Sequence, residues 1–270
     1  AIACSLVCST NYILSTHIEG GEVSGTIDEI FRHCNTKLCS IHMVSSRRAK
    51  KRVMQLGEIN ENIFVIGSPE IDIHSRDSGV SIDQVKKRYG ITFKEYGICI
   101  FHPVTSELKN IKQQSIDLFN VLSKSNKNYV VILPNNDPGS DFIREEINKL
   151  NKERFLTLPS MRFNYFSELM KNCSIFIGNS SAGIREVPIF GICSIDIGSR
   201  QHNRAISQSI KQIKASEKKE FLKLILNNWN KKYNKDLSYG EGDAAKKFVK
   251  IIKNQKIWDI SLQKKFNDSQ

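Results

Sequence analysis

The first residues whose types and spacing suggest chemistry are carboxylates near the beginning of the chain. Residues 17–22 read His-Ile-Glu-Gly-Gly-Glu, and residues 25–29 read Gly-Thr-Ile-Asp-Glu. Two glycines directly after Glu19 allow the backbone to turn tightly and a ligand to approach it. Glu19 and Asp28 together could supply an acid and a base for proton transfer. The structural alternative is that Asp28 only stabilises the first turn of a helix through the helix dipole.

A histidine and an asparagine stand directly after two later apolar runs. Residues 102–105 read His-Pro-Val-Thr, and His102 could donate to a phosphate or protonate a leaving group. It could equally cap the helix that follows. Residues 134–140 read Pro-Asn-Asn-Asp-Pro-Gly-Ser, a sequence that turn and helix-capping preferences largely explain. Asn135 within it could also contact the base or ribose of a nucleotide.

The most specific motif is Gly-Asn-Ser-Ser-Ala-Gly-Ile-Arg-Glu at residues 178–186. Small residues at the start of a helix present free N–H groups and hydroxyls, which suit a diphosphate. Glu186 could accept hydrogen bonds from both ribose hydroxyls, although an ordinary turn capped by Ser180 is the alternative. Residues 198–201, Gly-Ser-Arg-Gln, follow the next apolar run, and Arg200 could pair with a phosphate.

These motifs need a scaffold, and the pattern of apolar residues predicts one. From residue 97 onward, strands are expected at residues 98–101, 129–133, 155–158, 174–177 and 193–197. The helices expected between them cover residues 108–123, 140–151, 164–171 and 182–187. Apolar strands that alternate with helices indicate a parallel sheet covered on both faces. Ligands bind beyond the carboxyl ends of such strands, which is where the motifs stand.

The first 68 residues show the same style in a shorter form. Strands are expected at residues 13–18, 40–44 and 63–66, and helices at residues 28–38 and 46–56. Residues 1–14 are expected to contribute a buried helix that leads into the first strand. A polar linker is expected at residues 72–81, and an amphipathic helix at residues 244–253.

The expected fold class is therefore α/β, with two Rossmann-like doubly wound domains. Residues 1–69 should be the C-terminal part of a first, incomplete domain. Residues 70–245 should be the second, nucleotide-binding domain, and residues 246–270 a C-terminal helix and tail. Half a parallel sheet would expose its edge and its core.

Composition restricts the class of protein further. The 270 residues are 40% hydrophobic and 25% charged, which is typical of soluble globular proteins. The net charge of +12 comes largely from lysine, without the reading module or interleaved aromatic residues of a nucleic-acid-binding protein. Seven cysteines show no Cys-x-x-Cys pair and no zinc-ligand spacing. They indicate the reduced thiols of a cytoplasmic protein without a metal site.

The motifs resemble those of the UDP-N-acetylglucosamine 2-epimerases, in the same order, from about residue 1 to residue 253. Tyr-Gly-Glu-Gly-Asp at residues 239–243 adds to the resemblance. The forms His-Ile-Glu-Gly-Gly and Gly-Asn-Ser-Ser are similar to those of the hydrolysing branch, which serves sialic-acid-type biosynthesis. The N-terminal part of that family, with a further catalytic Asp, is not matched, so the chain as given is expected to be inactive or unstable.

The resemblance implies a GT-B arrangement of two domains with the active site in the cleft between them. It implies that Glu19 and Asp28 are the catalytic carboxylates and that His102 lies near the diphosphate. The positions implied to hold UDP are Asn135, Ser180, Ser181, Gly183, Glu186 and Arg200. The implied reaction eliminates UDP from UDP-N-acetylglucosamine and adds water, which needs no metal or redox cofactor. No nucleic-acid or membrane partner is implied, and the intact protein is expected to be a dimer.

Several alternatives stay open. A GT-B glycosyltransferase shares the architecture, but it is not expected to have the Glu19–Asp28 pair. A catalytically inactive nucleotide-sugar-binding protein would bind UDP without turnover, and a nucleic-acid module would be retained on DNA or RNA in a salt-sensitive way. Within the epimerase family, the substrate could instead be the GDP counterpart or a UDP-2,4-diacetamido-trideoxy sugar.

Overall fold

The chain is described by a computed structural model that covers residues 1–204, 207–265 and 267. It divides into two compact units, and each is described by itself. Unit 1 consists of Ala1–Arg76 and Leu237–Gln270, and unit 2 consists of Asp77–Asp236. This division differs from the expected domains at both boundaries. Residues 70–76 and 237–245 belong to unit 1, and residues 246–270 are part of unit 1 rather than a separate tail.

Unit 2 is built on a six-stranded parallel sheet. Its strands are β4 (Gly97–Ile100), β5 (Tyr129–Ile132), β6 (Phe155–Leu158), β7 (Ile175–Gly178), β8 (Ser194–Ile197) and β9 (Ile210–Ile213). They lie in the order β6-β5-β4-β7-β8-β9, so the direction of strand addition reverses between β4 and β7. This reversal is the topological switch point of a Rossmann-like sheet, where ligands bind beyond the strand ends.

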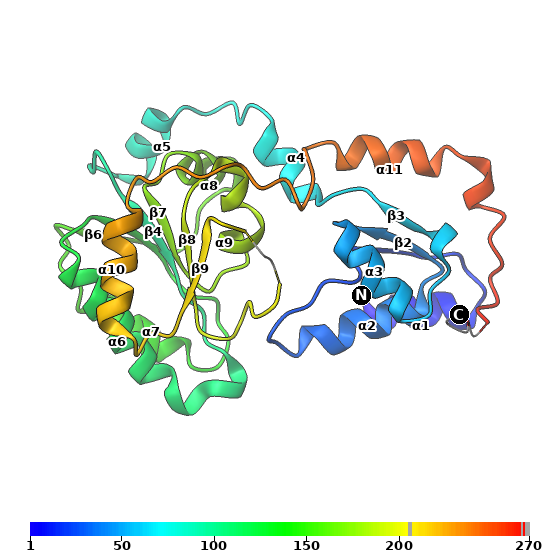
Figure 1. Ribbon diagram of the computed structural model, residues 1–270, viewed down its shortest axis with the longest axis horizontal. Coiled ribbons are helices and arrows are strands. Elements are labelled where there is room, and N and C mark those ends of the chain that lie inside the picture. Colours follow the sequence, from blue (N-terminus) through cyan, green and yellow to red (C-terminus); the bar gives the residue numbers. More distant parts are fainter. Residues whose placement is uncertain (205–206, 266, 268–270) are drawn as a thin grey trace. The chain divides into compact units, whose positions relative to one another are not determined.

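Helices cover both faces of this sheet (Figure 1). They are α5 (Ile82–Tyr89), α6 (Ile111–Lys124), α7 (Ser140–Asn148), α8 (Phe163–Lys171), α9 (Ala182–Arg185) and α10 (Lys218–Asn228). Successive strand residues point to opposite faces. In β4, Cys99 therefore belongs to the core under α6, α7 and α10, while Ile98 and Ile100 belong to the core under α5 and α8. Burial on both faces explains why the strands are apolar without alternation.

Three elements of unit 2 were not expected from the sequence: β9, α5 and α10. Helix α5 begins with a capping box, in which the Ser81 side chain accepts from the Gln84 backbone and the Gln84 side chain accepts from the Ser81 backbone. It ends at Gly90 in the left-handed conformation, with φ of +66°. The capping signal was present in the sequence, but the short helix is rich in lysine and its apolar pattern is weak.

Unit 1 contains a three-stranded parallel sheet in the order β1-β2-β3. The strands are β1 (Thr16–Ile18), β2 (Ile41–Val44) and β3 (Ile63–Val65). The helices are α1 (Ile2–Thr10), α2 (Asp28–Leu38), α3 (Arg47–Gln55), α4 (Pro69–Ser75) and α11 (Ala244–Ile252). Every element expected before residue 68 is present, with bounds that differ by at most a few residues.

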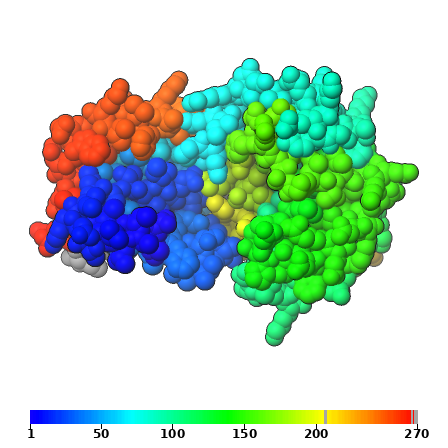
Figure 2. Space-filling view, turned by 180° about the vertical axis from the view of Figure 1, so that it is seen from behind, coloured from blue at the N-terminus to red at the C-terminus, as the bar shows by residue number. Residues whose placement is uncertain are grey.

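Helix α1 corrects one expectation. It was expected to be buried, but only Ser5 in it is buried, and Leu6 and Val7 expose 53% and 57% of their surface. Figure 2 shows this segment, in dark blue, at the molecular surface. Within unit 1, no described element lies over these apolar side chains, so the apolar composition of residues 1–14 located the helix but not its burial.

The segment expected as a linker is partly a helix that anchors the end of the chain. Asp72 lies in α4 with 4% of its surface exposed. Its two carboxylate oxygens accept hydrogen bonds from the backbone N–H groups of Ala244 and Ala245, both at 2.8 Å. Asp72 therefore satisfies the first free N–H groups of α11. This contact explains why the C-terminal helix belongs to unit 1.

No helix in the described part of the chain is long and apolar enough to cross a membrane. All seven cysteines lie among the described residues and are unpaired. Four of them are buried: Cys39, Cys99, Cys173 and Cys193.

Candidate active site

One asparagine side chain connects the loops that follow β4 and β7, at the switch point of unit 2. His102 follows β4, and Asn179 follows the neighbouring strand β7. The His102 backbone N–H donates to Asn179 Oδ1 at 2.7 Å, and Asn179 Nδ2 donates to the His102 carbonyl oxygen at 2.8 Å. Asn179 is 1% exposed. The side-chain amide of Asn179 thus fixes the loop after β4 and the loop after β7 relative to each other.

The Asn179 backbone also binds the loop that follows β8. Its carbonyl oxygen accepts from Arg200 Nη1 at 3.2 Å and from Gln201 Nε2 at 2.9 Å. Three strand-end loops therefore meet at this residue. Asn179 and Gln201 stand inside motifs that the sequence singled out, but only their more reactive neighbours were assigned a role.

His102 is held as a neutral imidazole. The backbone N–H of Asn135 donates to His102 Nδ1 at 3.2 Å, so the ring proton is carried by Nε2. Burial, and after it the positive charge of Arg200, lowers the pKa of His102 to about 4. At neutral pH the side chain can donate a hydrogen bond through Nε2–H. A neutral imidazole does not carry the extra proton that an imidazolium would transfer as a general acid.

The start of α9 is packed directly on the sheet. Gly178 has φ of +137°, and a Cβ atom there would lie 1.8 Å from the Ile100 carbonyl oxygen, so only glycine fits. Gly183 faces the sheet as well, because a Cβ atom there would lie 2.6 Å from Ser194 Oγ. For Gly183 this packing is a structural reason for glycine, and its predicted nucleotide contact stays a prediction.

The polar residues around α9 lie at its two ends. Ser180 Oγ accepts from the Ala182 backbone N–H at 3.4 Å, but the N-cap position of α9 is Ser181 rather than the expected Ser180. Ser181 is the residue before the first helical one, and Glu186 is the residue after the last. Glu186 is 7% exposed. The motif thus brings two hydroxyls and a carboxylate to one short helix, as a phosphate and ribose site would require.

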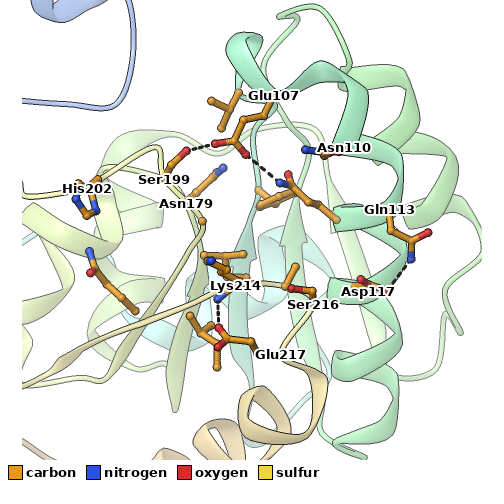
Figure 3. A pocket seen from close by; sticks show the side chains of 18 residues that line it. Glu107, Asn110, Gln113, Asp117, Asn179, Ser199, His202, Lys214, Ser216 and Glu217 are labelled. Carbon is orange, nitrogen blue, oxygen red and sulfur yellow. Dashed lines mark hydrogen bonds between the residues drawn. The ribbon is translucent and has the colours of Figure 1, made fainter.

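A cavity of about 580 Å³ opens on the α6 side of Asn179. Figure 3 shows Glu107 beside Ser199, and the Glu107 carboxylate accepts hydrogen bonds from the side chains of Ser199 and Gln114. Glu107 therefore braces the loop that carries Arg200. None of the predicted nucleotide-binding residues lines this cavity. The strand-end loops, rather than this cavity, define the candidate site.

The predicted catalytic carboxylates belong to unit 1. Glu19 follows β1 in the left-handed conformation, with φ of +64°, which costs a non-glycine residue about 1–2 kcal/mol. Its carboxylate accepts from Ser68 Oγ at 2.7 Å. Asp28 is the exposed first residue of α2 and accepts from Thr26 Oγ1 at 3.1 Å. That is the position in which a carboxylate stabilises a helix start, as the structural alternative expects, and the catalytic role of Asp28 stays a prediction.

The loop that presents Glu19 is rigidly packed. Gly21 has φ of +76°, and a Cβ atom there would lie 2.3 Å from the Ala49 carbonyl oxygen. Arg52 Nη1 donates to the Gly21 carbonyl oxygen, and the buried Glu22 accepts from the Ser45 hydroxyl. The second glycine of the motif is thus required by packing against α3. A ligand cannot approach the backbone on that side.

The strand order of unit 2 defines a doubly wound α/β protein, and its polar strand-end loops form a site at the switch point. Proteins of this class bind nucleotides at that point. The sequence model of the UDP-N-acetylglucosamine 2-epimerase family matches residues 1–253. The chain belongs to this family. No group of three or more His, Cys, Asp or Glu residues in the described ranges is placed to hold a metal ion.

Curated relatives cover nearly all of the chain. The UDP-N-acetylglucosamine 2-epimerase of Neisseria meningitidis serogroup B is 39% identical over 271 residues, which is 99% of this chain and 72% of that protein. A hydrolysing UDP-N,N'-diacetylbacillosamine 2-epimerase of Legionella pneumophila is 30% identical, over 88% of this chain and 63% of its own length. The polysialic acid biosynthesis protein P7 of Escherichia coli is also 30% identical, over 93% of this chain and 66% of its own length.

Solved structures show the same fold. The UDP-GlcNAc 2-epimerase from Neisseria meningitidis bound to UDP-GlcNAc superposes with a TM-score of 0.79 at 17% identity, over 94% of this chain and 73% of that one. The enzyme from Methanocaldococcus jannaschii in complex with UDP-GlcNAc and UDP gives a TM-score of 0.76 at 16% identity, over 93% and 72% of the two chains.

Proposed function

We propose that this protein is a hydrolysing UDP-N-acetylglucosamine 2-epimerase, which converts UDP-N-acetylglucosamine and water to N-acetylmannosamine and UDP. The observation that carries the proposal is the junction at Asn179. It brings together a neutral His102 donor, the Arg200 guanidinium and the N-terminal end of the α9 motif. A diphosphate needs such a set of donors, because its charge must be matched by several N–H groups.

In this proposal the nucleotide is held by unit 2. Ser180 and Ser181 bind phosphate oxygens, and Arg200 and His102 Nε2–H donate to the diphosphate. Glu186 accepts from the ribose hydroxyls, and Asn135 contacts the nucleoside. Gly183 lets α9 lie close to the sheet. These donors stabilise the negative charge that grows on UDP as the bond to the sugar breaks.

The proposed reaction has two steps. The bond between sugar C1 and the diphosphate oxygen breaks, and a carboxylate takes the proton from C2, which leaves a C1–C2 double bond in 2-acetamidoglucal. Water then adds its hydroxyl to C1, and C2 receives a proton on the opposite face. Glu19 and Asp28 are proposed as the base and the acid, and which does which is open. Departure of UDP precedes loss of the weakly acidic C2 proton. The rate therefore depends on how strongly the site stabilises the negative charge of the departing diphosphate.

The hydrolysing branch is supported by named relatives. The Legionella relative is called hydrolysing, and the E. coli relative is named for polysialic acid biosynthesis. Formation of free N-acetylmannosamine fits a place in sialic-acid-type biosynthesis. A second candidate substrate is a UDP-2,4-diacetamido-trideoxy sugar, which the name of the Legionella relative favours.

The test is incubation of the full-length protein with UDP-N-acetylglucosamine in deuterated water, followed by NMR of both products. UDP and N-acetylmannosamine carrying deuterium at C2 are expected. Glu19→Gln and Asp28→Asn should abolish turnover and leave the UDP dissociation constant unchanged. Glu61→Gln is the matched control, because Glu61 is an exposed carboxylate of the same unit. Full activity in both the Glu19→Gln and the Asp28→Asn variant would refute the assignment of these carboxylates as acid and base. Sugar release only in the presence of an acceptor would favour a glycosyltransferase.

A further inference from the structure

The end of β3 places a buried hydroxyl against Glu19. Ser68 is the third residue after β3, and none of its surface is exposed. Its Oγ donates to Glu19 Oε1 at 2.7 Å, across 49 residues of sequence. A hydroxyl in this place orients the carboxylate and stabilises its ionised form, because the hydrogen bond is stronger to a charged acceptor.

Ser68 is itself fixed by the returning end of the chain. Its backbone N–H donates to the Tyr239 carbonyl oxygen at 2.6 Å. Four residues later, Asp72 binds the first two N–H groups of α11. The stretch between Ser68 and Asp72 is therefore held at both ends by residues 239–245. Residues 239–243 resemble the family motif, but the sequence assigned them no role. The contact between Ser68 and Tyr239 supplies one.

Glu19 is a residue for which such support matters. Its backbone is in the left-handed region, which an ordinary side chain rarely adopts, and its N–H is held by the Met43 carbonyl oxygen at 2.8 Å. The backbone is thus fixed by β2, while the carboxylate is fixed by the residue that follows β3. Strain of this kind persists only where the surrounding structure determines the conformation.

We propose that Ser68 is a positioning residue for Glu19, and that the Tyr239 carbonyl group holds Ser68 in place. The inference rests on the proposed function, because it assumes that the Glu19 carboxylate takes part in proton transfer. Ser68 acts through Glu19 and does not touch the substrate.

Two variants and one control test the inference. Ser68→Ala removes the hydroxyl with little change in volume, and Ser68→Thr keeps it. Ser5→Ala is the control, because Ser5 is a buried serine of unit 1 whose Oγ donates to Asn35 Oδ1 at 2.9 Å. We expect Ser68→Ala to lower kcat about tenfold to a hundredfold, and to move the acidic limb of the kcat–pH profile upward. The UDP dissociation constant should stay unchanged, Ser68→Thr should recover part of the rate, and Ser5→Ala should match the wild type.

A second measurement does not depend on turnover. The ¹³Cδ signal of Glu19, assigned by its loss in Glu19→Gln, is followed against pH in the wild type and in Ser68→Ala. The titration midpoint should rise in Ser68→Ala, since the carboxylate loses a donor. An unchanged midpoint would overturn the inference whether or not the protein turns over. If Glu19→Gln is inactive and Ser68→Ala has the wild-type rate and pH profile, the inference fails alone. If Glu19→Gln is fully active, the proposed role of Glu19 fails instead.

Discussion

Replacement of Asn179 by alanine should destabilise unit 2 by a predictable amount. The change removes both hydrogen bonds between the Asn179 amide and the His102 backbone, which are 2.7 and 2.8 Å long. It leaves one N–H and one carbonyl group without their protein partner at a site where Asn179 is 1% exposed. An orphaned buried polar group costs about 1–3 kcal/mol. Since His102 is only partly buried and water can satisfy part of the loss, we expect a total of about 2–4 kcal/mol.

The assay is urea unfolding followed by tryptophan fluorescence. The chain has two tryptophans, of which Trp229 lies in unit 2 and Trp258 in unit 1. A Trp258→Phe background therefore makes the signal report unit 2 alone. Asn172→Ala is the control, because Asn172 is an exposed residue of unit 2 whose side chain donates to Glu168 in the same helix end.

The control should change the free energy of unfolding by less than about 0.5 kcal/mol. If Asn179→Ala is no more destabilising than Asn172→Ala, the amide does not join the two loops and the reasoning is refuted. If the slope of the free energy of unfolding against urea concentration decreased while the transition midpoint stayed the same, the substitution would have changed the unfolded state instead.

Two further predictions concern the same unit. Glu186→Ala should weaken UDP binding by about 1–3 kcal/mol in calorimetry if this carboxylate holds the ribose. The control, replacement of the exposed Glu153 by alanine, should leave UDP binding unchanged. Equal UDP dissociation constants for Glu186→Ala and the wild type would return Glu186 to a structural role. His102 should make unit 2 less stable in acid, because its folded pKa of about 4 lies below the ordinary value of 6.5. Between these two values the unfolded state binds the proton and the folded state does not. Stability should therefore be unaffected above pH 6.5 and fall as the pH drops toward 4, by up to about 3 kcal/mol. His102→Gln should remove this part of the pH dependence in urea titrations at pH 7 and pH 4.5; a parallel fall in both proteins would contradict it.

Most strands and helices of both units could be predicted from the sequence because each is a local pattern. Residues 28–38 were expected as a helix and form α2, and residues 155–158 form β6 as expected. Strand β9 was missed because the two middle residues of Ile-Lys-Gln-Ile are polar, so the run is neither continuously apolar nor alternating, and the strand lies at the sheet edge, where it is only partly buried. The burial of α1 was also misjudged, since an apolar pattern does not say whether another element covers it.

The site was accessible to sequence reasoning only in part. Motifs placed after apolar runs were expected at one edge of the unit 2 sheet, and they lie together there, since parallel strands end on the same side. Residue type directed attention to His102, Ser180 and Arg200, whereas the residue that joins their loops is the amide Asn179. An amide has no reactive signature, and its importance comes from two hydrogen bonds to residue 102, far away in sequence.

By itself, the sequence determined the α/β class, the family motifs and the chemical groups that we propose bind a nucleotide. Those are properties of residue type, spacing and local periodicity. The tertiary structure decided which loops those groups share, the neutral state of His102 and the burial of Ser68 against Glu19. It also decided that the C-terminal helix belongs to the first unit, through Asp72. These features depend on contacts between residues distant in sequence and on exclusion of water, and neither can be read from a local pattern.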